Sequence, residues 1–263
     1  MKFILSITFL CATLMVFAQE NKNTLLGSFN SKNKKSIYSS FQFDGNGKVS
    51  INEMDQYDFF ERNDSIIILV EKTYFIFQKQ KNNELKGISE WVNGDVFKSK
   101  DKTFQYADNN PTKSKRANNI SKYFEINYSD MMNYLAEGDG SFNSLLRDLK
   151  KKNEVLCQDN LDLSCIQVFV MTLTEDMGGF DAFINSEIQV LKSKPNPSLE
   201  KLGQKIIQLG NAEGYGLLSQ YYELINVPEK AQSFKEIGLE KGCKLCLELE
   251  MNQFLNNMQE DEN

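Results

Sequence analysis

The apolar residues of this chain change their spacing part-way along it, and this change constrains the fold more than any other feature of the sequence. Between Thr24 and about Ser99, apolar and polar residues alternate in short runs separated by turn-forming residues, which is the pattern of half-buried antiparallel strands. From Tyr123 onward the apolar residues recur three or four positions apart, as they do on one side of a helix. The sequence therefore predicts an α+β chain of two domains, with strands in residues 24–100 and helices in residues 123–258.

The first domain is expected to be an antiparallel β meander that closes into a small barrel. Turn-forming residues at Asp44–Gly47 and Asn93–Asp95 predict hairpins, because glycine and asparagine tolerate positive φ. Residues 101–122 are polar and lack a sustained period, which predicts a linker. The predicted strands are Leu25–Phe29, Ile37–Phe43, Lys48–Ile51, Gln56–Glu61, Ser65–Val70, Thr73–Phe77, Glu84–Val92 and Val96–Lys98.

The second domain is expected to be a series of short helices joined by tight turns, because glycine and proline residues interrupt the helical pattern at regular intervals. Such helices bury their apolar sides only by stacking as helical hairpins, so the expected architecture is α-solenoid-like. The apolar positions that define the predicted helices are Met131, Met132 and Leu135; Phe142, Leu145, Leu146 and Leu149; Ile166, Phe169, Val170 and Leu173; Phe183, Ile184, Ile188 and Leu191; and Leu199, Leu202, Ile206 and Leu209.

Residues 1–18 have the pattern of a secretory signal peptide. Lys2 supplies a positive charge, an apolar run follows, and the run ends on the small residue Ala18, after which a signal peptidase would cut. A retained membrane helix is the alternative, but the run is shorter than the roughly 20 residues needed to span a bilayer. We expect cleavage after Ala18, a mature chain without a membrane span, and a location in a periplasm or outside the cell.

Charge and the absence of histidine exclude several classes of function. Without Lys2 the mature chain has 29 basic and 36 acidic residues, a net charge of -7, which argues against nucleic-acid binding because phosphate contacts need a basic face. The chain contains no histidine, which excludes Ser-His-Asp and Cys-His catalysis and imidazole-ligated zinc. We predict no catalytic residue, no cofactor and no metal, and expect that the protein is not an enzyme.

Four cysteines remain after cleavage, namely Cys157, Cys165, Cys243 and Cys246. An even number of cysteines in an exported chain predicts two disulfides, with three possible connectivities, and the spacings favour local pairs. Cys243 and Cys246 also form a C-x-x-C motif at a predicted helix start, a position that favours redox exchange. A structural disulfide is the favoured interpretation of this motif. A redox centre, and a metal site made of all four thiolates, are the alternatives.

Small residues recur at Gly214, Ala231 and Gly238 within the segments GNAEGYGLLSQYY, residues 210–222, and VPEKAQSFKEIG, residues 227–238. This pattern resembles a Sel-one-like repeat, the short relative of the tetratricopeptide repeat. In that family a small residue opens the first helix, Lys-Ala opens the second helix, and a glycine closes the hairpin. The resemblance implies stacked helical hairpins that bind a protein or peptide.

The cysteine-rich branch of that family has a disulfide between cysteines that are separated by seven residues. Cys157 and Cys165 have this separation, so the resemblance implies that they pair and join one hairpin to the next. At the later hairpin Gly238 occupies the place of the first cysteine. This departure leaves Cys246 without the family's usual partner.

Gly27-Ser28-Phe29 stands at the start of the predicted barrel. A glycine and an aromatic residue in the opening strand, followed by up-and-down hairpins, resemble the small lipocalin-like barrels of exported bacterial proteins. In such a barrel Trp91, the only tryptophan, could line a ligand cavity, although filling of the core is the favoured interpretation. So few residues are expected to make a barrel too narrow for more than its own side chains.

Tyr215, Tyr222 and Phe234 are the candidate binding residues of the helical domain, because they can lie on a concave face. Packing between adjacent hairpins is the alternative and favoured role. The leading hypothesis for the whole chain is an exported protein–protein interaction module without catalytic activity. A small-molecule carrier that uses the β domain, and a thiol-disulfide oxidoreductase that uses the C-x-x-C motif, are the alternative functions.

Overall fold

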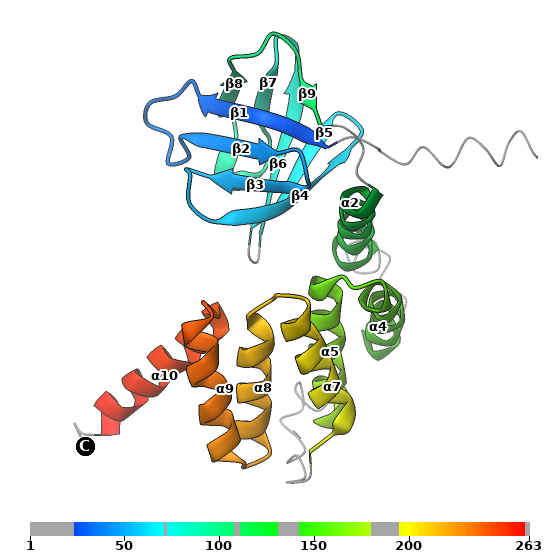
Figure 1. Cartoon of the computed structure of the whole chain (residues 1–263), viewed down its shortest axis with the longest axis vertical. Coiled ribbons are helices and arrows are strands. Elements are labelled where there is room, and N and C mark those ends of the chain that lie inside the picture. Colours follow the sequence, from blue (N-terminus) through cyan, green and yellow to red (C-terminus); the bar gives the residue numbers. More distant parts are fainter. Residues whose placement is uncertain (1–23, 71–72, 108–110, 131–141, 180–194, 261–263) are drawn as a thin grey trace, which may run out of the picture. The chain divides into compact units, whose positions relative to one another are not determined.

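The computed structural model of this chain describes residues 24–70, 73–107, 111–130, 142–179 and 195–260 (Figure 1). The predicted signal peptide lies outside these residues, and so do the helices predicted around Met131 and Phe183. The chain divides into two compact units between Lys122 and Tyr123.

The first unit contains a closed antiparallel barrel of eight strands (Figure 1). Each of these strands pairs with the next in sequence, and β1 pairs with both β2 and β8, so the sheet closes on itself. The strands are β1 (Leu25–Ser31), β2 (Ser40–Asp44), β3 (Lys48–Ile51), β4 (Gln56–Arg62), β5 (Ser65–Val70), β6 (Thr73–Gln80), β7 (Glu84–Gly87) and β8 (Val96–Ser99), and a short β9 (Gln105–Tyr106) also pairs with β1. The eight predicted strands are therefore confirmed, except that β7 ends early and is followed by the 3-10 helix η1 (Glu90–Val92).

Phenylalanine side chains fill the interior of the barrel. Alternation along the strands points them inward, and their rings meet mostly edge to face. The ring centroid of Phe41 lies 4.9 Å from that of Phe77 and 4.9 Å from that of Phe97. The most completely buried aromatic residues of this core are Phe29, Phe41, Phe43, Phe59, Phe75, Phe77 and Phe97. The barrel thus encloses its own side chains, as its narrow diameter leads one to expect.

The turn between β2 and β3 has the predicted residues in the predicted conformation. Gly45 and Gly47 have φ values of 73° and 85°. Asp44 Oδ1 accepts hydrogen bonds from the backbone N–H groups of Asn46 and Lys48, at 2.6 and 3.0 Å. The aspartate therefore closes an Asx-type turn that fixes the hairpin register.

Residues 101–122 are not the linker that their polarity predicted. They contain β9 and most of helix α2 (Pro111–Phe124). The apolar residues of this helix, Ala117, Ile120 and Phe124, follow an i, i+3, i+7 spacing but are few among many polar residues. The helical period was too weakly marked to be recognised in the sequence.

Ion pairs hold α2 on the barrel. The guanidinium of Arg116 donates to both carboxylate oxygens of the buried Asp58 on β4, at 3.1 and 2.8 Å, and Lys48 Nζ lies 2.8 Å from the same carboxylate. Burial alone would raise the pKa of Asp58, but the hydrogen bonds and charges of Arg116 and Lys48 outweigh it and hold the pKa below its ordinary value. Asp58 is therefore a charged anchor for α2 at neutral pH.

The second unit is helical throughout its described residues. Gly210 and Gly242, with φ values of 84° and 77°, end helices, as predicted. Pro197 and Pro228, which were expected between helices, are the first residues of α7 and α9. The elements are the π-helix η2 (Glu125–Asp130), α4 (Phe142–Gln158), α5 (Asp162–Asp176), α7 (Pro197–Gln208), α8 (Glu213–Leu224), α9 (Pro228–Glu240) and α10 (Lys244–Glu260). The predicted helices that fall within the described residues are confirmed.

Helix α8 occupies the middle of this unit. It contacts α7, α9 and α10, and its buried residues Leu218, Tyr221 and Tyr222 belong to one continuous apolar core (Figure 1). A disulfide between Cys157, near the end of α4, and Cys165 on α5 belongs to the same core. The local pair of cysteines is thus present as predicted.

Candidate functional site

The predicted aromatic residues come together between α8 and α9. The ring of Tyr222 stacks on that of Phe234, with centroids 5.6 Å apart and an angle of 6° between the planes. The ring centroid of Tyr215 lies 6.5 Å from that of Phe234. Tyr222 is buried and the other two are half-buried. The structure therefore gives these residues the packing role rather than an open concave surface.

Polar partners surround the Tyr222 hydroxyl. It donates a hydrogen bond to Glu200 on α7, and Lys230 Nζ lies 3.4 Å from the hydroxyl and 4.8 Å from the ring centroid. Burial, and then the hydrogen bond to the Glu200 carboxylate, raise the pKa of Tyr222 well above its ordinary value. The raised pKa keeps the phenol protonated at neutral pH, and its hydrogen bond to Glu200 ties α7 to α8.

The C-x-x-C motif forms a disulfide between Cys243 and Cys246 in the first turn of α10. Both residues are buried. The carboxylate of Glu213 caps this helix start, because it accepts hydrogen bonds at 2.9 Å from the backbone N–H groups of Lys244 and Leu245. Glu213 Oε2 also lies 3.8 Å from Cys243 Sγ. The surroundings favour a structural disulfide over a redox centre.

Two glycines make room for these sulfur atoms. A Cβ atom on Gly216 would lie 3.0 Å from Cys243 Sγ, and a Cβ atom on Gly238 would lie 2.2 Å from Cys246 Sγ. Gly238 thus stands against Cys246, at the place where the resembling family has a cysteine. Because Cys246 pairs with Cys243, it has a partner after all, although not the one that the repeat pattern implies.

A buried lysine on α9 joins this helix to α10. The sequence alone gives little indication of this role. Lys235 Nζ lies 3.1 Å from Glu250 Oε2 and donates a hydrogen bond to Gln253 Oε1 at 2.6 Å. The only signal in the sequence is its place four residues after Ala231, on the side of α9 that faces the core. Lys235 fixes the side of α10 that faces α9.

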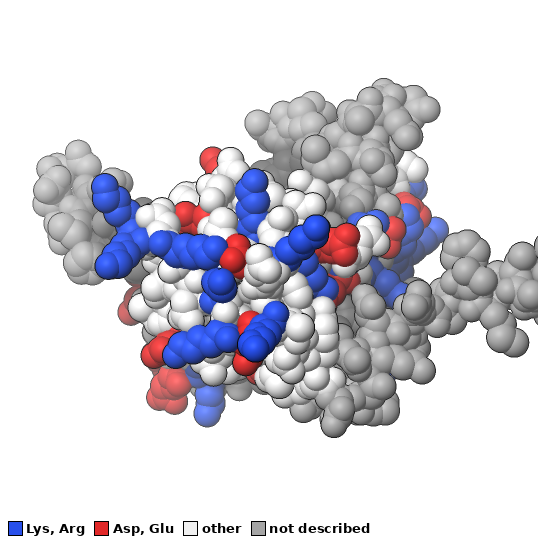
Figure 2. Space-filling model, turned by 90° about the horizontal axis from the view of Figure 1, so that it is seen from above, with Lys and Arg blue, Asp and Glu red and all other residues white. Residues whose placement is uncertain are grey.

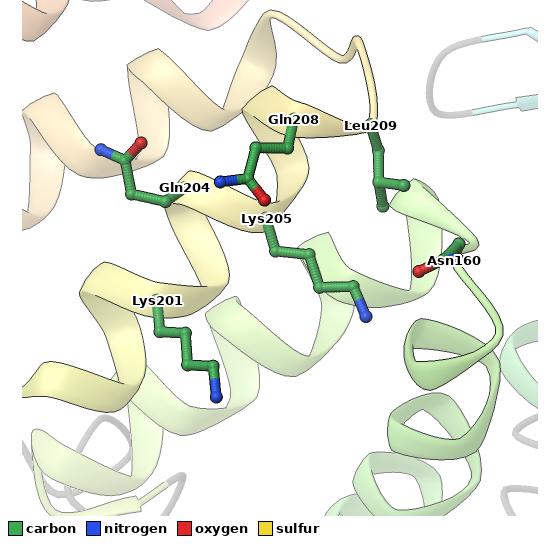
Figure 3. A pocket seen from close by; sticks show the side chains of 6 residues that line it. All are labelled: Asn160, Lys201, Gln204, Lys205, Gln208 and Leu209. Atoms are coloured by element: carbon green, nitrogen blue, oxygen red, sulfur yellow. The ribbon is translucent and has the colours of Figure 1, made fainter.

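The surface of α7 lines a polar pocket of about 300 Å³, which Figure 3 shows from close by. Lys205 is already engaged there, because its Nζ donates to the backbone carbonyl of Cys157 at 2.7 Å and so caps the end of α4. The lining residues, none of which the sequence pattern predicts as a site, are Asn160, Lys201, Gln204, Lys205, Gln208 and Leu209. The pocket lies between α7 and the turn that joins α4 to α5.

Trp91 lies neither in a cavity nor in the core. It belongs to η1, between β7 and β8, and 59% of its surface is exposed. The prediction that it lies on a strand is wrong because Gly87 and Ile88 turn the chain out of β7, where a Cβ on Gly87 would lie 1.9 Å from the Val92 carbonyl oxygen. The neighbouring Val92 fills the core instead.

The described residues hold no cluster of three or more cysteine or carboxylate side chains that could bind a metal ion. The four cysteines lie in two separate disulfides, so the predicted alternative of a four-thiolate site is wrong. Within the described part of the chain no helix has the length and apolar character needed to span a membrane.

Comparisons with known proteins add no relative to this description. No protein-family model, no curated protein and no solved structure matches the chain. The resemblances to Sel-one-like repeats and to lipocalin-like barrels stay predictions from sequence.

Proposed function

We propose that this chain is an exported, non-enzymatic binding protein whose stacked helical hairpins, of the Sel-one-like type, hold a basic protein or peptide on the outer side of α10. The two disulfides support export, since such bonds persist in oxidising compartments. The leader at residues 1–18 is the sequence argument for the same conclusion.

An apolar stripe on α10 is the observation that carries the binding role. Leu247 and Met251, one helical turn apart, have 53% and 56% of their surface exposed. The neighbouring Glu250 pairs with Lys235 of α9, so it marks the side of α10 that faces α9. The apolar stripe lies next to this side. An apolar outer side indicates a surface that a partner covers.

Charge argues for a basic partner. Residues 123–263 contain 12 basic and 23 acidic residues, a net charge of -11, whereas residues 24–122 contain 16 basic and 12 acidic residues. On the face that Figure 2 shows, which is seen from above the view of Figure 1, lysine and arginine side chains lie among carboxylates. Glu240 and Glu248, on either side of the α9–α10 turn, are exposed and make no ion pair among the described residues. The electrostatic field of this net negative charge steers a basic partner toward the helical unit.

The two alternative functions have less support. A carrier needs space in the barrel, which the phenylalanine core fills. A thiol-disulfide enzyme needs an accessible sulfur with a stabilised thiolate, whereas Cys243 is buried beside Glu213.

Site-specific photo-crosslinking in the native host tests the proposal. A photoreactive phenylalanine analogue at Met251 is expected to crosslink one defined protein with a basic isoelectric point, and the same analogue at Ser233, which is exposed on α9, is the control. The yield should fall as salt is raised, because screening weakens the attraction. No product at position 251, or identical products at both positions, would contradict the proposal.

A further inference from the structure

One end of the barrel gathers exposed apolar residues on loops that are distant in sequence. In an up-and-down barrel every second connection lies at the same end. The β1–β2, β3–β4 and β7–β8 connections, residues 32–39, 52–55 and 88–95, therefore share one end, which we name the Trp91 end. The exposed fractions of the large apolar side chains in these loops are 79% for Ile37, 75% for Met54, 59% for Trp91 and 49% for Ile88.

Hydrogen bonds hold these loops in place. Asn52, at the β3–β4 turn, donates from Nδ2 to the carbonyl oxygen of Ile37 at 3.1 Å. On the other side of the β1–β2 loop, the carboxylate of Asp95 accepts hydrogen bonds from Asn33 and Ser36. The loop between them thus joins both neighbouring connections. The exposed apolar side chains therefore project from loops that hydrogen bonds hold in one conformation. Exposed apolar side chains on fixed loops form a contact surface that needs no ordering when a partner binds.

The rim of the Trp91 end carries both signs of charge. Lys34 and Lys35 lie on the β1–β2 loop, Glu53 is next to Met54, and Glu90 is next to Trp91 in sequence. All four of these charged residues are exposed, and none makes an ion pair within the described part of the barrel. The three loops together contain three lysines and four acidic residues, so they give neither a polyanion nor an anionic bilayer a net attraction.

We infer that the Trp91 end binds the same end of a second copy of this chain through a two-fold contact. A two-fold interface brings one patch against itself, so the patch must carry its own complement. Here the apolar centre meets an apolar centre, and Lys34 and Lys35 of one copy meet Glu53 and Glu90 of the other. Tryptophan and methionine, two of the exposed side chains here, are enriched in protein interfaces.

Sedimentation velocity of the full chain over a range of concentrations tests this inference. The wild type is expected to show a monomer–dimer equilibrium, and Ile37→Asp should weaken the dimer at least tenfold. Val155→Asp, which changes an apolar residue on α4 that is 59% exposed, should leave the dimer unchanged. Circular dichroism confirms that each variant is folded.

Charge-reversal variants test whether the dimer forms through this contact and not through another surface. A Lys34→Glu/Lys35→Glu chain and a Glu53→Lys/Glu90→Lys chain should each be monomeric, whereas their mixture should form a heterodimer. A monomeric wild type, or a mixture that stays monomeric, would overturn the inference. A blue shift of Trp91 emission on adding phosphatidylcholine vesicles to monomeric protein would also overturn it, because the patch would then be a lipid-binding surface.

Discussion

At the residue scale, close approach explains the glycines inside the helices, whereas turn geometry explains Gly210 and Gly242 at the helix ends. Gly238 sits inside α9, where a Cβ atom would overlap Cys246 Sγ and lie 2.9 Å from Tyr215 Cβ. We expect Gly238→Ala to lower the free energy of unfolding by about 1–3 kcal/mol, the usual cost of overpacking. Ser233→Ala on the exposed side of α9 should change it by less than about 0.5 kcal/mol. Urea denaturation measures both, and equal values would show that the sulfur atoms can move aside.

At the element scale, α2 depends on a charged anchor. The pKa of Asp58 is below its ordinary value in the folded state, so the carboxylate contributes stability above about pH 4 and loses this contribution as the pH falls through the lowered pKa. Asp58→Asn should therefore cost about 1–3 kcal/mol at pH 7, where Arg116 loses its charged partner, and less in strong acid. Denaturant melts between pH 7 and pH 2 test this, with the exposed Asp64→Asn as control. A cost that does not change with pH would contradict the role of Asp58.

At the scale of the whole molecule, the sequence predicts the regular parts of the fold and misses features that depend on tertiary contacts. Alternation of apolar and polar residues located the strands, and the helical period located α4, α5 and α7. Helices α8 and α9 were expected from the resemblance of residues 210–238 to a helical repeat. The docking of α2 rests on the Arg116–Asp58 ion pair, which has no local signal in the sequence. The exposure of Trp91 also has no local signal in the sequence. Only the pairing of β7 with β8 shows that η1, which contains Trp91, bulges out of the barrel.

The candidate site was predictable only in part. The aromatic residues of α8 and α9 were recognisable as a group, but helical spacing does not say whether a ring faces a neighbouring helix or the solvent. The structure turns Tyr222 inward and leaves Leu247 and Met251 outside. The proposed binding surface is therefore on α10 rather than at the aromatic cluster.

The most direct test of the proposed function is hydrogen exchange of the full chain, alone and with the partner that crosslinks at Met251. If the outer side of α10 binds the partner, amides in residues 244–251 should exchange more slowly in the complex, and the barrel strands should be unchanged. Slower exchange confined to residues 24–107, with α10 unaffected, would contradict the proposal that the helical unit is the binding module.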